Sequence, residues 1–166
     1  MCRPMPVPVP GPPGPIGPAG PSGGLAAYGS VFQFGEKAFA VTLPGEVVPI
    51  TFGSNGLLGP GISHTPETAD VGTAMAGDYD IRFSLDISVS AAVPATFAIQ
   101  VNGASLPGGI FTRTLAAGFQ TISGAAMVSL AQNDVVRLIL TAPYALVVTL
   151  TGANVAGSLQ IKKLNG

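Results

Sequence analysis

Residues 80–88 read Asp-Ile-Arg-Phe-Ser-Leu-Asp-Ile-Ser, and this stretch decides the fold. Successive side chains of a β-strand point to opposite faces, so residues at every second position share a face. The apolar residues of the stretch follow that spacing: Ile81, Phe83, Leu85 and Ile87. Charged and hydroxyl side chains occupy the positions between them. The pattern predicts a strand of a sheet that has one buried face and one exposed face.

Similar short runs of β-branched and aromatic residues extend in both directions over residues 25–166, and none has helical spacing with caps. The predicted strands are 28–34, 39–43, 47–52, 57–63, 69–74, 79–88, 95–101, 110–113, 119–130, 134–141, 146–151 and 158–164. The predicted turns are 35–37, 53–56, 77–78, 102–103, 107–109, 132–134 and 152–154, which are rich in Gly, Asn, Asp and Pro. The nearly continuous run 135–140 suits a strand that is buried on both faces. Ten to twelve strands at this spacing predict an all-β jelly-roll sandwich.

The composition indicates an assembled protein. Charged residues make up 9% of the 166 residues, against about 25% in typical domains, and the mean hydropathy is +0.52. The longest apolar stretch, 135–150, is interrupted by Arg137 and Pro143, whereas a membrane helix needs about 20 uninterrupted apolar residues. We therefore expect no membrane partner, and we expect the excess apolar surface to contact other protein subunits.

Other function classes have little support in the sequence. A net charge of −1 without a basic patch argues against nucleic acid as a partner. His64, the single histidine, could join a serine and Asp70 or Asp78 in a triad, but no nucleophile turn is nearby, so we predict a surface or interface histidine and no enzyme. No ligand spacing indicates a metal or cofactor, although a calcium site between Asp78 and Asp80 is an alternative.

Residues 11–24 carry glycine at every third position, and proline follows each of the first four. These glycines are Gly11, Gly14, Gly17, Gly20 and Gly23. Only glycine fits at the axis of three wound polyproline-type chains, so the register predicts a collagen-like stalk of three copies, roughly 40 Å long. Four triplets stabilise a triple helix too little to form it unaided, so the stalk requires a trimeric head beside it.

Residues 1–10 precede this stalk and alternate proline with apolar residues. The alternating run is Met5, Pro6, Val7, Pro8, Val9 and Pro10, which predicts a stiff extended rod. Because a rod that is already stiff loses little entropy on binding, we predict a docking peptide, with a plain spacer as the alternative. Cys2, the single cysteine, is either an inert thiol at a chain end or an interchain crosslink.

Three motifs of the head, together with the triplets before it, carry a family likeness. They are Gly-Asp-Tyr-Asp-Ile-Arg-Phe at 77–83, Leu-Ala-Gln-Asn-Asp-Val-Val at 130–136, and Ala-Gly-Ser-Leu-Gln-Ile-Lys-Lys-Leu at 156–164. The chain resembles the collagen-like exosporium glycoproteins (BclA) of the Bacillus group, whose C-terminal domains are trimeric jelly rolls of the complement/tumour-necrosis-factor type. The resemblance implies a connector at 1–10, a stalk at 11–24 and a homotrimeric head at 25–166.

The stalk differs from the long, threonine-rich collagen regions of that family, because it has four triplets and no threonine. A short stalk after a proline-rich rod is similar to a thin endospore appendage (Ena-type) fibre subunit. We therefore expect trimers that stack head to tail through the connector on the spore surface, with an anchor protein and a tip protein as further partners. No apolar signal segment follows Arg3, so we expect synthesis in the mother-cell cytoplasm. The alternatives are a terminal adhesin or receptor-binding head and a viral tail-fibre protein.

The trimer axis is predicted to be dry and nearly uncharged. The candidates are large apolar residues from the predicted apolar strands: Phe32, Phe34, Phe119, Tyr144 and Leu146.

Overall fold

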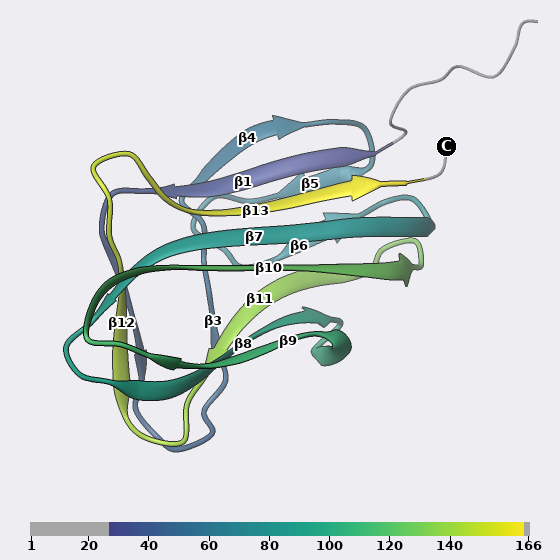
Figure 1. The fold of residues 1–166 in the computed structure, drawn as a ribbon. Helices are drawn as coiled ribbons and strands as arrows, with labels where there is room; N and C mark the ends of the chain where they lie inside the picture. The colour runs from purple at the N-terminus through teal and green to yellow at the C-terminus, as the bar shows by residue number, and fades with distance from the viewer. Residues whose placement is uncertain (1–26, 165–166) are drawn as a thin grey trace, which may run out of the picture.

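The computed structural model describes residues 27–164, and within them it has thirteen β-strands and no helix that could cross a membrane (Figure 1). The strands in chain order are β1 (Tyr28–Phe34), β2 (Lys37–Val41), β3 (Val48–Pro49), β4 (Ser54–Leu58), β5 (Ile62–His64), β6 (Val71–Thr73), β7 (Gly77–Val89), β8 (Val93–Val101), β9 (Ala104–Leu115), β10 (Gly118–Leu130), β11 (Val135–Thr141), β12 (Leu146–Leu150) and β13 (Val155–Lys163).

The strands form two sheets that pack face to face. The seven-stranded sheet has the order β2-β12-β7-β13-β1-β4, with β10 paired to β7, and it lies nearer the viewer in Figure 1. The six-stranded sheet behind it has the order β5-β6-β11-β8-β9, with β3 paired to β11. All strand pairs within residues 27–164 are antiparallel, and neighbours such as β13 and β1 are far apart in sequence. This arrangement confirms the predicted all-β jelly-roll sandwich.

The hydrophobic core lies between the two sheets, and β7 shows how the sequence builds it. Ile81, Leu85 and Ile87 are fully buried, and Phe83 packs its ring edge-on against Phe111 at 5.3 Å between centroids. On β11 one face buries Val136, Leu138 and Leu140, whereas on the other face Ile139 is buried and Val135, Arg137 and Thr141 are half-buried, so the predicted burial on both faces is confirmed only in part. Burial of each large apolar side chain contributes about 1.5–3 kcal/mol, so this layer is the main source of stability.

Three predicted turns are wrong, and the backbone explains each. Residues 77–78 are the first two residues of β7, and the bend lies before them at 74–75. Residues 53–56 begin strand β4, and the turn falls instead at 59–61, where Gly61 has φ +80°, so the predicted strand 57–63 is two strands. Residues 107–109 lie within β9, where the register against β8 shifts between Ala98 and Gln100. Such a bulge tolerates a proline, because the ladder hydrogen bonds are already interrupted there.

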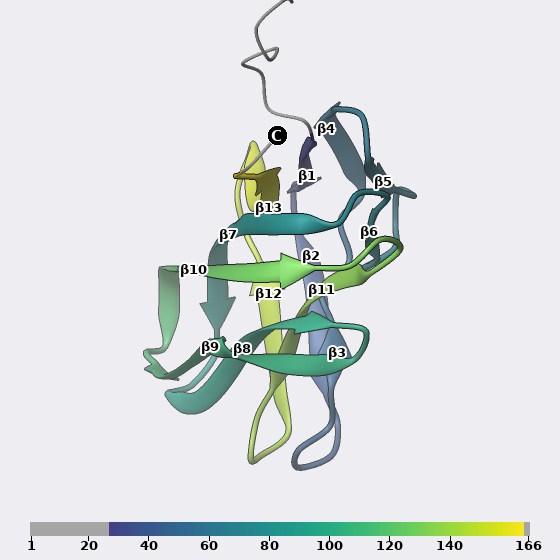
Figure 2. The same ribbon diagram turned by 90° about the vertical axis from the view of Figure 1, so that its right-hand side faces the viewer.

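Both ends of the described chain lie side by side (Figure 1). The amide of Lys163 donates a hydrogen bond of 2.8 Å to the carbonyl oxygen of Ala27. Two loops that connect the two sheets, 42–47 and 141–145, project at the side of the molecule farthest from this point, at the bottom of Figure 2. The head therefore presents different surfaces at its chain-entry side and at these loops.

Candidate assembly surfaces

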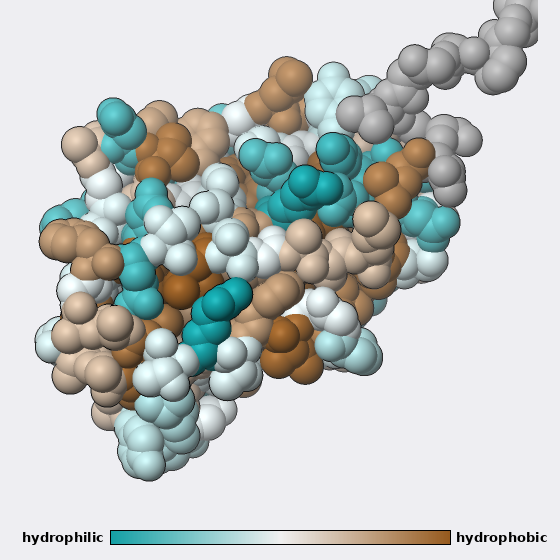
Figure 3. Space-filling model, in the orientation of Figure 1, coloured by the Kyte–Doolittle hydropathy of each residue, from teal (hydrophilic) through white to brown (hydrophobic). Residues whose placement is uncertain are grey.

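The outward face of strands β1, β13, β7 and β10 is a broad surface of mostly small and polar side chains. The strand registers align its residues in rows across the sheet: Phe32, Ser158, Ser84 and Ser123 in one, and Ser30, Gln160, Arg82 and Ala125 in the next. Figure 3 views this side, where pale residues cover much of the middle and hydrophilic ones gather toward the chain termini. Short side chains in the middle leave room for another protein surface to approach the sheet closely.

Apolar side chains border this face on two sides. On one side, β1 and β4 present Tyr28, Phe34 and Leu57, and the Phe34 ring contacts that of Phe32 at 4.8 Å between centroids. On the other side, β10 presents Phe119 and Met127, which are 83% and 75% exposed. Isolated exposed apolar residues are common, but two apolar borders around a flat face indicate an interface between proteins.

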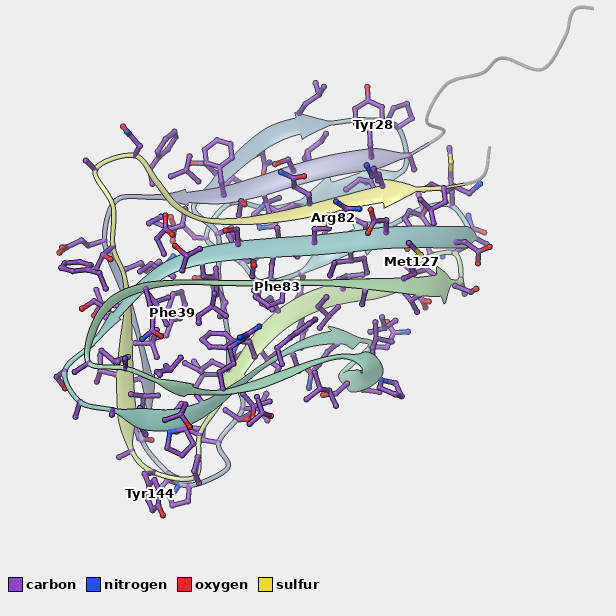
Figure 4. All side chains as sticks on the ribbon, viewed as in Figure 1. Tyr28, Phe39, Arg82, Phe83, Met127 and Tyr144 are labelled. Carbon is purple, nitrogen blue, oxygen red and sulfur yellow. The ribbon has the colours of Figure 1, made fainter. Side chains whose placement is uncertain are left out.

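A buried carboxylate lies on the same face. Asp80 is 4% exposed, and Arg82 Nε donates to its Oδ2 at 2.8 Å. Figure 4 shows Arg82 between Tyr28 and Met127, and a hollow of about 170 Å³ lies there against Tyr28, Leu57 and Lys162. Burial of a charge is costly unless it is paired, so the bond from Arg82, two residues along the same strand, compensates the buried Asp80 carboxylate.

A second surface, which we call the tip, consists of loops 42–47 and 141–145. Leu43, Pro44, Gly45 and Glu46 form a tight turn: the Glu46 amide donates to the Leu43 carbonyl at 3.1 Å, and Gly45 has φ +78°. Proline followed by a glycine at positive φ is typical of a type II turn. The Gly45 amide also donates to the Ala142 carbonyl at 2.8 Å, which joins the two loops.

The tip displays apolar side chains despite this rigid backbone. Leu43 and Tyr144 are 67% and 64% exposed, and Val47 and Val147 are about half exposed. Glu46 turns inward, because its carboxylate accepts bonds from the Thr42 hydroxyl, the Thr42 amide and the Leu43 amide. These bonds, the Thr42 hydroxyl first, lower the pKa of Glu46. The tip therefore offers an ordered and largely uncharged surface.

The five residues predicted for the trimer axis lie in three different places. Phe32, Phe34 and Phe119 are on the outward face or at its borders, whereas Tyr144 is at the tip (Figure 4). Leu146 is 9% exposed and packs in the core of the sandwich, where it pairs across the sheet with Val41. The structure brings the three phenylalanines to one sheet, but it leaves Leu146 inaccessible to another subunit.

His64 lies at the end of β5 and has the features of a structural histidine. Its Nδ1 is 2.5 Å from the Asn55 side-chain oxygen, and its Nε2 is 3.1 Å from the Thr68 carbonyl oxygen. Asp70 pairs with Arg137, and that hydrogen bond lowers the pKa of the Asp70 carboxyl. Both ring nitrogens of His64 are therefore held by neighbouring residues, which is typical of a structural histidine.

The alternative calcium site is not supported by the described carboxylates. Asp80 is paired with Arg82, and Asp78 accepts a hydrogen bond from the Ser129 hydroxyl. Within residues 27–164, no group of three or more His, Cys, Asp or Glu side chains could hold a metal ion.

Several predicted residues lie outside the described residues: Cys2, the connector 5–10 and the five stalk glycines. The three motifs that carry the family likeness lie within them and are structural. Residues 77–83 begin β7, where the buried Tyr79 hydroxyl donates to the Met75 carbonyl at 2.8 Å and burial raises the pKa of Tyr79. Residues 130–136 form the β10–β11 turn, in which Asp134 Oδ2 accepts from the Ala131 amide at 2.7 Å.

Comparisons with known proteins agree with this fold. Murine APRIL at pH 5.0 superposes with a TM-score of 0.61 at 14% identity, covering 83% of this chain and 98% of that one. The globular domain of zebrafish complement 1qA gives 0.55 at 14%, covering 84% and 98%. Eiger TNF from S. frugiperda gives 0.57 at 13%, covering 85% and 92%.

These likenesses show a jelly-roll sandwich of the C1q/TNF type, as the sequence predicts. No curated protein matches the chain in sequence. The family model described as the BclA C-terminal domain matches residues 30–165, which is most of the chain and nearly all of its sandwich. The chain therefore belongs to the BclA C-terminal domain family.

Proposed function

We propose that this chain is a non-enzymatic subunit of a spore-surface fibre, with a homotrimeric head and a collagen-like stalk. The single observation that carries the proposal is the position of a BclA C-terminal domain, residues 30–165, directly after the glycine triplets that begin at Gly11. A triplet register requires three chains, and a head of this family at its end supplies the means to bring them together.

The outward face of the seven-stranded sheet supports self-association. Its flat middle of serine and alanine complements the protruding border that Phe119 and Met127 form on β10. When unlike surfaces of identical chains contact each other, the chains form a closed ring if the rotation from one copy to the next divides a full turn evenly. A rotation of a third of a turn gives a trimer. We propose Phe32, Phe34 and Phe119 as interface residues and leave out the buried Leu146.

The fibre is proposed to grow by head-to-tail stacking of trimers. Residues 5–10 of one trimer bind the next trimer. Cys2 is three residues before this segment, so its thiol can form a disulfide between chains at the same contact. A contact of this kind joins unlike surfaces without closing, so it produces an open filament.

Negative-stain electron microscopy of the purified full chain, beside a version lacking residues 1–10, tests this function. We expect fibres from the full chain and compact trimers from the shortened one. Fibres from both would show that the connector does not join the trimers. Compact particles with a stalk from both would favour the terminal binding-head alternative, with the rod as an anchor.

A further inference from the structure

The tip has no partner among the described residues, although it is the most apolar of the loop surfaces. Leu43, Val47, Tyr144 and Val147 are each at least half exposed, and all four belong to two loops or the strand that follows them. In Figure 3 the lowest part of the molecule is pale teal, the colour of weakly hydrophilic residues, and no saturated teal lies there. A cluster of apolar side chains on rigid loops favours a binding surface over a flexible connection.

We propose that the tip binds residues 5–10 of a chain in the next trimer, an inference that rests on the proposed function. The first reason is chemical. The segment Met-Pro-Val-Pro-Val-Pro carries no charge and is stiff, and proline-rich extended peptides bind surfaces that display aromatic and aliphatic side chains. Tyr144 supplies an exposed aromatic ring, and Leu43 and Val47 supply exposed aliphatic groups on the other loop, which the Gly45–Ala142 bond joins to it.

The second reason is the place at which the chain enters the head. Ala27, the first described residue, lies beside Lys163 at the side of the molecule opposite the tip (Figure 2). The collagen-like stalk proposed for residues 11–24 would span roughly 40 Å and would carry the connector away from its own head. In a head-to-tail stack, the connector of one trimer therefore meets the tip of its neighbour.

The third reason is that the tip is ordered before binding. A hydrogen bond from the Glu46 amide to the Leu43 carbonyl closes the turn at Leu43–Glu46. The Glu46 carboxylate also accepts hydrogen bonds from Thr42, the residue before the turn. Neither loop needs to order when the peptide binds, and the peptide itself is stiff, so the entropy cost of the contact is small. The tip also lies beyond the ends of β2 and β12, away from the outward face proposed for trimer contacts.

The first test is a full chain with Leu43→Ser and Tyr144→Ser, compared with Ile110→Ser. Ile110 is 48% exposed on β9 of the other sheet. Its substitution therefore also replaces an exposed apolar side chain with serine, but outside the tip. We expect the double variant to keep the mass of the trimer but to need at least about tenfold more protein to form fibres, which corresponds to about 1.4 kcal/mol. We expect the Ile110 variant to form fibres as the unchanged chain does.

Fibres from the double variant at the unchanged concentration would overturn the tip assignment and leave the fibre function intact. Absence of fibres from the unchanged chain would overturn both. The two failures are therefore distinguishable in one experiment.

A second test locates the contact directly. In full chains with Cys2→Ser, a chain with Val9→Cys is mixed with a chain with Tyr144→Cys, and disulfide-linked pairs are counted on a non-reducing gel. A mixture with Ile110→Cys in place of Tyr144→Cys is the control. We expect linked pairs only in the Tyr144 mixture. No pairs in that mixture, or equal numbers in both, would overturn the proposal.

Discussion

The inner face of β7 and the tip both display large apolar side chains, but they use them in opposite ways. On β7, Ile81, Phe83 and Leu85 point between the sheets and are almost fully buried. At the tip, Leu43 and Tyr144 are exposed to solvent on two loops that a backbone hydrogen bond from Gly45 to Ala142 joins. Large apolar residues on the inner faces of the strands therefore build the core, whereas those in the tip loops remain exposed in the single chain.

The largest effect on stability should come from a substitution in the core. We expect Phe83→Ala to lower the free energy of unfolding by about 3–5 kcal/mol, because it removes a ring that contacts Phe97 and Phe111 and leaves a cavity. Urea denaturation at a fixed protein concentration measures this change, since assembly itself adds stability. A loss below about 1 kcal/mol would mean that the sheets do not pack around this ring.

The next largest effect should follow a small addition to the same layer. A Cβ at Gly124 would lie 2.6 Å from the Phe111 ring and 2.7 Å from the Phe83 ring, so Gly124→Ala should destabilise the chain by about 1–3 kcal/mol. Gly108→Ala is the matched control, because a Cβ there meets nothing within 4 Å. Equal denaturation midpoints for the two variants would contradict the close approach of β10 to the aromatic cluster.

A change at the border of the outward face separates folding from assembly. Phe119 is almost entirely exposed in one subunit, so Phe119→Asp should change the stability of the fold by no more than about 0.5 kcal/mol. In a trimer, the same change places an unpaired charge in an apolar contact and should release single chains. Size-exclusion chromatography with light scattering measures the mass, and an unchanged oligomer would remove Phe119 from the interface.

The smallest effect should be a pH dependence at the tip. Its hydrogen bonds hold the pKa of Glu46 below the ordinary value of 4.5, so they stabilise the loop above that pH and are lost as the pH falls through the lowered pKa. We expect the Leu43 and Thr42 amide resonances to shift in acid in the unchanged chain and not in Glu46→Gln. Identical titrations would show that Glu46 does not order the loop.

The sequence predicts the sandwich well, because alternation reports burial directly. The period of β7 identifies its inner face, and the continuous run 135–140 identifies a strand with one fully buried face. The tip is less predictable. Leu43 and Val47 read as the ends of adjoining strands, although the Pro44-Gly45 pair between them is a turn pattern that could have located it.

Leu146 and Tyr144 show why the assembly surfaces are harder to predict than the fold. Two residues apart and both apolar, they look alike in sequence, but Leu146 faces the core because β12 pairs with β2, and Tyr144 precedes that strand. Alternation along β12 shows that Leu146 shares a face with Val148 and Leu150. Which face meets the core depends on the pairing of β12 with β2, more than a hundred residues away in the chain.

The mass of the full chain in solution tests the central claim most directly, because every proposed assembly step starts from a unit of three. Native mass spectrometry of protein diluted until any fibres dissociate should give three times the 16.5 kDa of one chain. Single chains of 16.5 kDa at concentrations where the protein remains folded would contradict the trimer, and with it the stalk and the fibre.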